Sequence, residues 1–113
     1  MSALPGEQTA GFVHVCAAAA IPDPGRQTFE VGDRFIVVFH VEGQFWAIDD
    51  CCTHDDGPLG EGRLEGFAIV CPRHGAKFDI RDGRVLSMPA TRDTPAHQVK
   101  VDSGELYVKL CES

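Results

Sequence analysis

The sequence lacks the features that define several large classes of protein. Its longest apolar run, Val15 to Ile21, has seven residues, whereas a membrane-spanning helix needs about 20. Met1 to Gly11 contains no Lys or Arg, so no export signal is expected and the predicted compartment is the cytoplasm. Basic residues are scarce: 10 Lys and Arg stand against 17 Asp and Glu, a formal net charge of -7. This charge argues against nucleic acid or an anionic membrane as the partner.

Motifs of common catalytic sites are also missing. The chain contains no G-x-S-x-G sequence, no H-E-x-x-H sequence and no glycine loop of the kind that cradles a phosphate. It has no internal repeat and no low-complexity linker. These absences disfavour the hydrolases, zinc proteases and nucleotide-binding enzymes that such motifs mark.

The composition is that of one small globular domain. The chain has 113 residues, of which 43% are hydrophobic and 24% charged, so we expect a single domain over residues 1–113. A core of this size is thin and is often supplemented by disulfides or a metal. The chain contains five Cys and five His. In a cytoplasmic protein an odd number of Cys favours metal ligands and spare thiols over a disulfide framework.

Short segments rich in Val, Ile and Phe, separated by Gly, Asp and Pro, predict an all-β domain. The expected strands are Gln27–Val31, Arg34–His40, Phe45–Asp49, Gln98–Asp102 and Glu105–Leu110. The expected turns between them are Gly32-Asp33, Glu42-Gly43 and Ser103-Gly104. Alternate residues of the last hairpin should form its buried face, namely Val99, Val101, Leu106, Val108 and Leu110. Ala17 to Ala20 suits a short helical turn, which Pro22 and Pro24 would end.

The middle of the chain has a different composition. Asp50 to Ala90 is dense in Gly, Pro, Cys and His, which predicts loops around a site. Two clusters stand out within it, Cys52-Thr53-His54 and Cys71-Pro72-Arg73-His74. Thiolate and imidazole bind iron, zinc or copper well at neutral pH, and two loops that each offer one of each can enclose a metal centre.

From the residues alone, the identity of the metal stays open. Cys51 also forms a C-x-x-H pair with His54, so two such pairs would serve a structural zinc site in a binding module. The remaining Cys, Cys16 and Cys111, lie in apolar segments and are expected to be small buried hydrophobes. Ordinary roles are also expected elsewhere: Trp46 as core packing, and His14, His40 and His97 as solvated or singly hydrogen-bonded side chains.

A longer pattern extends these clusters. The sequences Cys52-Thr53-His54, Gly57-Pro58-Leu59, Cys71-Pro72-Arg73-His74-Gly75 and Phe78-Asp79 together resemble the signature of Rieske 2Fe-2S proteins. The resemblance covers about Gly11 to Cys111 and is closest to the soluble Rieske-type ferredoxins of bacterial aromatic-ring-hydroxylating dioxygenase systems. It implies a β-sandwich or barrel base of small antiparallel sheets, from residues 11–45 and 91–111. A loop-rich cluster-binding subdomain, about residues 46–90, would be inserted into this base.

The resemblance also implies the ligands of one 2Fe-2S cluster per chain. Cys52 and Cys71 would bind the inner iron, and His54 and His74 the outer iron. Two imidazoles in place of thiolates raise the reduction potential above that of all-Cys ferredoxins. The surrounding Gly-Pro-Leu and His-Gly-Ala-Lys-Phe-Asp sequences favour this cluster over zinc, and Cys52 over its neighbour Cys51, because an ordinary zinc site has no need of them.

The residues around the implied ligands indicate a low potential. High-potential respiratory members carry an extra Cys in each loop, joined as a disulfide, where this chain has Gly57 or its neighbours and Arg73. They also carry Ser and Tyr hydroxyls that donate to the cluster sulfurs, where this chain has Ala76 and Phe78. Without those hydrogen bonds the reduced cluster is less stabilised, so a potential near the lower end of the Rieske range, roughly -150 mV, is expected.

The other residues near the implied site suit shielding and docking. Pro58, Leu59 and the segment Met88 to Ala90 would cover the cluster, although Pro58 and Pro89 also suit plain turns. A rim of mixed charge, which can orient a docking partner or be ordinary solvated surface, surrounds the ligands: Asp55, Asp56, Arg73 and Lys77.

The function implied by the resemblance is electron transfer, without catalysis by the chain itself. Four protein ligands on two irons leave no open coordination position for a substrate. The implied route runs from a flavin-containing reductase to a terminal oxygenase, by transient docking through an exposed edge at His54 and His74. A monomer is expected. The small Rieske-type subunit of a nitrite reductase and a ferredoxin of iron-sulfur assembly are alternatives within the same resemblance.

Overall fold

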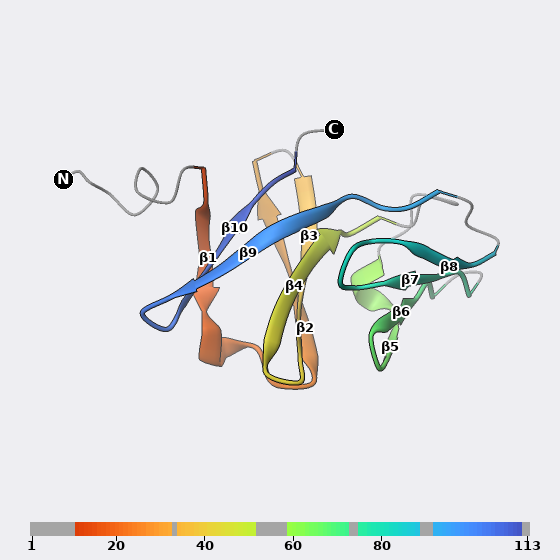
Figure 1. Ribbon diagram of the computed structural model, residues 1–113, viewed down its shortest axis with the longest axis horizontal. Helices are drawn as coiled ribbons and strands as arrows, with labels where there is room; N and C mark the ends of the chain where they lie inside the picture. The colour runs from red at the N-terminus through yellow and green to blue at the C-terminus, as the bar shows by residue number, and fades with distance from the viewer. Residues whose placement is uncertain (1–10, 33, 52–58, 73–74, 89–91, 112–113) are drawn as a thin grey trace.

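Antiparallel strands form nearly all of the regular structure (Figure 1). The computed structural model describes residues 11–32, 34–51, 59–72, 75–88 and 92–111. Ten strands and two three-residue 3-10 turns, η1 (Ala18–Ala20) and η2 (Leu59–Glu61), lie within them. The all-β class expected from the sequence is confirmed. In this part of the chain, no helix is long and apolar enough to span a bilayer.

The larger sheet has six strands, in the spatial order β1-β10-β9-β4-β3-β2. They are β1 (Val13–Ala17), β2 (Gly25–Val31), β3 (Arg34–Val41), β4 (Gln44–Asp49), β9 (Ala96–Asp102) and β10 (Glu105–Lys109). All five strands expected from the sequence lie in this sheet, each within two residues of its expected ends. The short helical turn is also present, as η1, whereas β1 was not expected because its residues run directly into the alanines of that turn.

The connection between β3 and β4 lies where the sequence predicted a turn. Val41 pairs with Gln44, so Glu42 and Gly43 form a two-residue loop. Both have positive φ, 52° and 80°. Two consecutive left-handed residues make the turn whose twist matches that of a hairpin, and glycine takes the second position without a steric penalty.

The smaller sheet has four strands, in the order β5-β6-β7-β8, and lies to the right of the larger sheet in Figure 1. These strands are β5 (Arg63–Glu65), β6 (Ala68–Val70), β7 (Lys77–Asp79) and β8 (Val85–Ser87). The expectation of loops throughout 50–90 was therefore wrong for these four segments. Each strand has only three residues, too few to show a period of two among the surrounding Gly, Asp and Pro.

Two buried clusters share strand β3. Val37, Phe39 and Val41 point to a cluster between the two sheets, and Ile36 and Val38 point to a second cluster on the opposite face. Burial on both faces accounts for the unbroken apolar sequence of this strand. The first cluster, called here the inter-sheet core, is completed by Ile48, Leu59, Ile69, Cys71, Ala76, Phe78 and Ile80. The second, called the base core, is completed by Ile21, Val31, Ala47, Leu106 and Val108.

The C-terminal hairpin follows the predicted pattern on one strand only. Leu106 and Val108 of β10 are fully buried, but Val101 of β9 is 50% exposed. The prediction of a buried Val101 was therefore wrong. β9 pairs with β4 only at Ala96 and His97, so beyond that point no strand of the described residues lies beside this edge of β9.

Candidate metal centre

The second of the two Cys-His clusters begins where strand β6 ends. Val70 pairs with Lys77 of β7, and the next residue, Cys71, donates its backbone N–H to the carbonyl of Ala76 at 2.7 Å. The N–H of Gly75 donates in turn to the carbonyl of Cys71 at 3.1 Å. Two backbone hydrogen bonds therefore hold Cys71 at the mouth of a tight loop between two paired strands.

The Cys71 side chain is buried, and no described residue is a partner for its sulfur. The residue is 2% exposed, packs in the inter-sheet core and forms no disulfide. Within the described part of the chain, its thiol makes no hydrogen bond. Cys71 also borders a hollow of about 410 Å³ lined by Glu61, Gly62, Arg63, Val70, Pro72 and Gly75. A soft donor held beside a hollow in this way is suited to an iron of an iron-sulfur cluster.

The structure places Cys71 and one flank of the first Cys-His cluster together. Leu59, which follows residues 52–58, is fully buried in the same inter-sheet core as Cys71. The other three expected ligands, Cys52, His54 and His74, lie outside the described residues. So do five of the residues expected to line or shield the site, namely Asp55, Asp56, Pro58, Arg73 and Pro89. Those expectations stay predictions.

Besides Leu59, two residues of the expected surround can be placed. Met88 is 76% exposed, so its own side chain covers little of the described surface. Lys77 lies on β7 with its Nζ 3.3 Å from Glu65 Oε1, in a partly exposed ion pair. Its charge is therefore shared with Glu65 of β5, across the intervening strand β6, and is not free to act alone as part of a rim.

The expected packing roles of Trp46 and the two outlying cysteines can also be compared with the structure. Trp46 is partly buried against the inter-sheet core that holds Cys71, and its ring meets the ring of Phe67 edge to face at 5.4 Å. This confirms the packing role. Cys16 and Cys111 are only partly buried, because they lie on the edge strand β1 and just after the end of β10.

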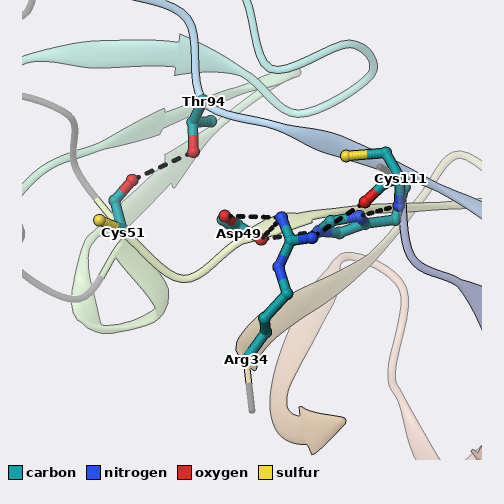
Figure 2. A network of polar contacts seen from close by, with 6 residues as sticks. Arg34, Asp49, Cys51, Thr94 and Cys111 are labelled. Carbon is teal, nitrogen blue, oxygen red and sulfur yellow. Dashed lines mark hydrogen bonds and ion pairs between the residues drawn. The ribbon is translucent and has the colours of Figure 1, made fainter. Parts of the chain in front are cut away.

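A polar network was not foreseen, and it lies where β4 leads toward the first Cys-His cluster (Figure 2). Arg34 donates from Nη2 to both carboxylate oxygens of Asp49, at 3.0 and 3.1 Å, and from Nη1 to the carbonyl of Cys111 at 2.9 Å. His97 Nε2 lies 2.7 Å from Asp49 Oδ1, and the backbone N–H of Cys111 donates to His97 Nδ1 at 3.0 Å. The prediction of a solvated or singly bonded His97 was therefore wrong: its side chain is fully buried and bonded at both nitrogens.

The same contacts determine how protons are arranged in the network. Because the Cys111 N–H donates to Nδ1 of His97, that nitrogen accepts and Nε2 carries the hydrogen that is donated to Asp49. Burial alone would raise the pKa of Asp49. Hydrogen bonds from His97 and Arg34, together with the Arg34 charge, outweigh that effect and lower the pKa below its usual value.

We expect Asp49 to make stability depend on pH in the acid range. A carboxyl with a lowered pKa in the folded state adds stability above its unfolded pKa of about 4, and this stability is lost as the pH falls through the lower folded value. Asp49→Asn should therefore cost about 1–3 kcal/mol at pH 7. The difference from the wild type should shrink as the pH falls below about 4. Urea unfolding between pH 7 and pH 3 measures this difference.

The matched control for this prediction is Asp82→Asn. Asp82 is 51% exposed, lies 3.9 Å from Arg84 in a loose surface ion pair, and accepts the backbone N–H of Arg84 at 2.9 Å, a bond that asparagine can also accept. This variant should change the unfolding free energy by less than about 0.5 kcal/mol at any pH. A cost for Asp49→Asn that stays constant from pH 7 to pH 3 would contradict the role given to its charge.

Comparison with known proteins gives one consistent result. A family model described as "Rieske [2Fe-2S] domain" matches residues 11–102. The ferredoxin subunit of 3-phenylpropionate/cinnamic acid dioxygenase from Photorhabdus laumondii is 38% identical over 99 residues, which is 87% of this chain and 93% of that protein. Ferredoxin CarAc from Metapseudomonas resinovorans is 39% identical over 98 residues, which is 86% of this chain and 92% of that protein.

Solved structures agree with the sequence relatives. The ferredoxin of carbazole 1,9a-dioxygenase from Nocardioides aromaticivorans has a TM-score of 0.86 at 25% identity, covering 90% of this chain and all of that one. A ferredoxin chain in a complex of reduced oxygenase and oxidized ferredoxin in carbazole 1,9a-dioxygenase has a TM-score of 0.84 at 34% identity. That match covers 91% of this chain and 98% of the other.

Proposed function

Because this chain belongs to the Rieske [2Fe-2S] domain family, we propose that it holds a Rieske-type cluster through Cys52, His54, Cys71 and His74 and carries single electrons to a terminal oxygenase. The observation that carries the proposal is the buried thiol of Cys71 beside a hollow, at a position of the family signature and without a hydrogen-bond partner among the described residues. The relatives that match nearly the whole chain are named as ferredoxin subunits of dioxygenase systems, which supports a carrier without catalysis of its own.

The bound cluster supplies storage for one electron at a time. The chain supplies the thiolate of Cys71, held by the backbone bonds to Ala76 and Gly75. It also supplies apolar side chains that exclude water, since Ala76 and Phe78 are fully buried in the same core as Cys71. Neither side chain has a hydroxyl to donate, which supports the low potential expected from the sequence.

The partners belong to the same proposal. One solved relative is a ferredoxin in complex with the oxygenase of carbazole 1,9a-dioxygenase. By analogy, this chain would dock transiently, as a monomer, to an oxygenase of that kind after accepting an electron from a flavin-containing reductase. Small and short-lived interfaces are typical of such encounters. The exchange would take place in the cytoplasm, in keeping with the thiols of Cys16, Cys71 and Cys111, none of which forms a disulfide.

Electron paramagnetic resonance of the dithionite-reduced protein, with metal and acid-labile sulfide analysis of the same sample, tests the proposal. We expect a rhombic signal with a low average g value, two irons and two sulfides per chain. A sample that gives no paramagnetic resonance signal and contains one zinc per chain would overturn the proposal and favour the structural zinc module. Adding the reduced protein to a purified aromatic-ring dioxygenase component, with reoxidation followed optically, tests the direction of transfer.

Adding a hydroxyl beside Cys71 should raise the reduction potential. Ala76→Ser places a donor at a fully buried position whose carbonyl already accepts from the Cys71 N–H. A hydrogen bond worth about 0.5–1.5 kcal/mol to the reduced state corresponds to a rise of about 20–65 mV for one electron. Redox titration monitored by circular dichroism measures the change. Ala47→Ser, the same substitution in the base core, should leave the potential unchanged, and equal shifts in both variants would refute the assignment.

A further inference from the structure

The first Cys-His cluster spans residues 52–58, and both of its flanks are described: Cys51 on one side and η2 on the other. The contacts that hold these two flanks determine where the segment that carries the expected ligands begins and ends. The contacts that hold them come from side chains far away in the sequence. An inference about these contacts rests on the proposed function, because it concerns how the ligands of that same site are positioned.

The N-terminal flank is held by the segment before β9. Thr94, which is 2% exposed, donates from Oγ1 to the carbonyl of Cys51 at 3.2 Å (Figure 2). Thr94 is itself fixed, because its N–H donates to the carbonyl of Gly83 at 2.8 Å. Just before Cys51, the N–H groups of Asp49 and Asp50 donate to backbone carbonyls of Pro95 and Phe35, both at 2.9 Å.

The C-terminal flank is held by two charged side chains. Asp50 accepts the N–H of Gly60 at 2.6 Å, and this contact closes the loop that contains the first Cys-His cluster. Arg26, on β2, donates from Nε to the carbonyl of Gly60 at 2.7 Å and from Nη2 to the carbonyl of Gly62 at 2.6 Å. Hydrogen bonds in which one partner is ionised are roughly twice as strong as neutral ones, and a two-pronged guanidinium also fixes orientation.

Close packing leaves η2 little freedom to move. A Cβ on Gly60 would lie 2.5 Å from Thr28 Oγ1 of β2, and a Cβ on Gly62 would lie 1.8 Å from the carbonyl oxygen of Val70 of β6. The backbone after the first Cys-His cluster therefore lies directly against the strand that leads to Cys71. This contact fixes the backbone at Gly62, just after η2, relative to the end of β6.

We infer that Asp50 and Arg26 are positioning residues for the first Cys-His cluster, which they fasten through η2 to the larger sheet. Asp50 closes the loop, and Arg26 holds the two carbonyls that follow it. Neither side chain needs to touch the metal for this role. Loss of groups that orient metal ligands typically costs about 10–100-fold in metal affinity. The expected consequence is faster metal loss without a matching loss of overall stability.

The test measures iron release from the cluster-loaded protein to an excess of a ferrous chelator after dithionite reduction. Asp50→Ala and Arg26→Met should release iron about 10–100-fold faster than the wild type and broaden the paramagnetic resonance signal. Asp50→Asn, which keeps the acceptor oxygen for Gly60, should restore release to within about threefold of the wild type.

Two controls separate positioning from general effects. Arg84→Met removes the same charge from an exposed side chain, 70% accessible, and should leave both release and spectrum unchanged. Val108→Ala weakens the base core without touching η2, and it shows how much release a global loss of stability causes. If Asp50→Ala does not accumulate as folded protein, iron release from Arg26→Lys is measured in its place. Lysine keeps the charge but not the two-pronged contact, so faster release from this variant is due to the lost contact.

The inference is overturned if Asp50→Ala and Arg26→Met release iron no faster than Val108→Ala, or if Asp50→Asn behaves like Asp50→Ala. A wild-type sample with two irons and two sulfides upholds the proposed function whatever the variants do. A wild-type sample that holds zinc would end the proposed function, while release of that zinc from the same variants would still decide whether Asp50 and Arg26 position the ligands.

Discussion

Replacing Cys71 by serine should yield a protein without its cluster. A hydroxyl is a hard and weakly acidic donor, whereas the site needs a soft thiolate, and the described residues contain no group of three or more His, Cys, Asp or Glu side chains that could hold a metal instead. Serine is close to cysteine in size, and the two hydrogen bonds that hold the loop use only backbone atoms, so the surrounding fold should remain. Iron retention should fall by more than the roughly 100-fold typical of supporting residues. Iron and sulfide analysis and the visible spectrum measure this loss.

Two serine variants serve as controls for the Cys71 prediction. Cys111→Ser alters a partly buried thiol and leaves the backbone N–H and carbonyl that this residue contributes to the polar network, so the cluster should be retained. Cys51→Ser should also retain it, because the family signature places the ligand at Cys52. Loss of iron in Cys51→Ser, with retention in Cys52→Ser, would mean that the first ligand had been assigned one residue too late. Retention of a Rieske spectrum in Cys71→Ser would refute the site itself.

Truncation of Phe78 to alanine should destabilise the domain by about 3–5 kcal/mol. Phe78 is fully buried in the inter-sheet core, on the strand that pairs with β6, which leads to Cys71. Removal of the ring leaves a cavity that the two sheets cannot close without shifting the loop. Small domains have a total stability of only about 5–15 kcal/mol, so this variant should lie near the limit of folding.

Phe35→Ala is the matched control, because Phe35 is 57% exposed and the substitution removes the same ring. It should cost no more than about 0.5 kcal/mol. Urea unfolding of both variants in the cluster-loaded form, followed by tyrosine and tryptophan fluorescence and by loss of the visible spectrum, gives the two free energies. If Phe78→Ala lowered the free energy of unfolding as little as Phe35→Ala is expected to, the inter-sheet core would contribute little to stability.

What the sequence predicts well is what local residues determine. The Glu42-Gly43 turn and the alternation of β10 are properties of a few neighbouring residues, and the structure follows them. The paired Cys-His spacing indicated Cys71 as a ligand, and the structure buries its side chain with no hydrogen bond to its sulfur from the residues that are described. For Cys52, His54 and His74 the basis is the spacing together with the family signature, and the ligand role of all four residues stays a prediction.

What the sequence does not predict depends on long-range register. His97 meets Asp49 only because β4 and β9 pair at Ala47 and His97, and no local pattern contains that pairing. Arg26 resembles any surface arginine in the sequence, yet it reaches carbonyls 34 and 36 residues away. Nor did the exposure of Val101 follow from alternation, since it depends on where the neighbouring strand ends.

Strand β3 makes the two halves of the molecule one cooperative folding unit. Consecutive residues such as Val37 and Val38 face different cores, so neither core can open while the backbone of this strand stays in place for the other. Local opening is therefore confined to elements outside the strand, and the amides of β3 should exchange their hydrogens only by global unfolding. Binding of the metal at one end of the domain then protects the far sheet as well, because a ligand that binds only the folded state stabilises every part that unfolds with it.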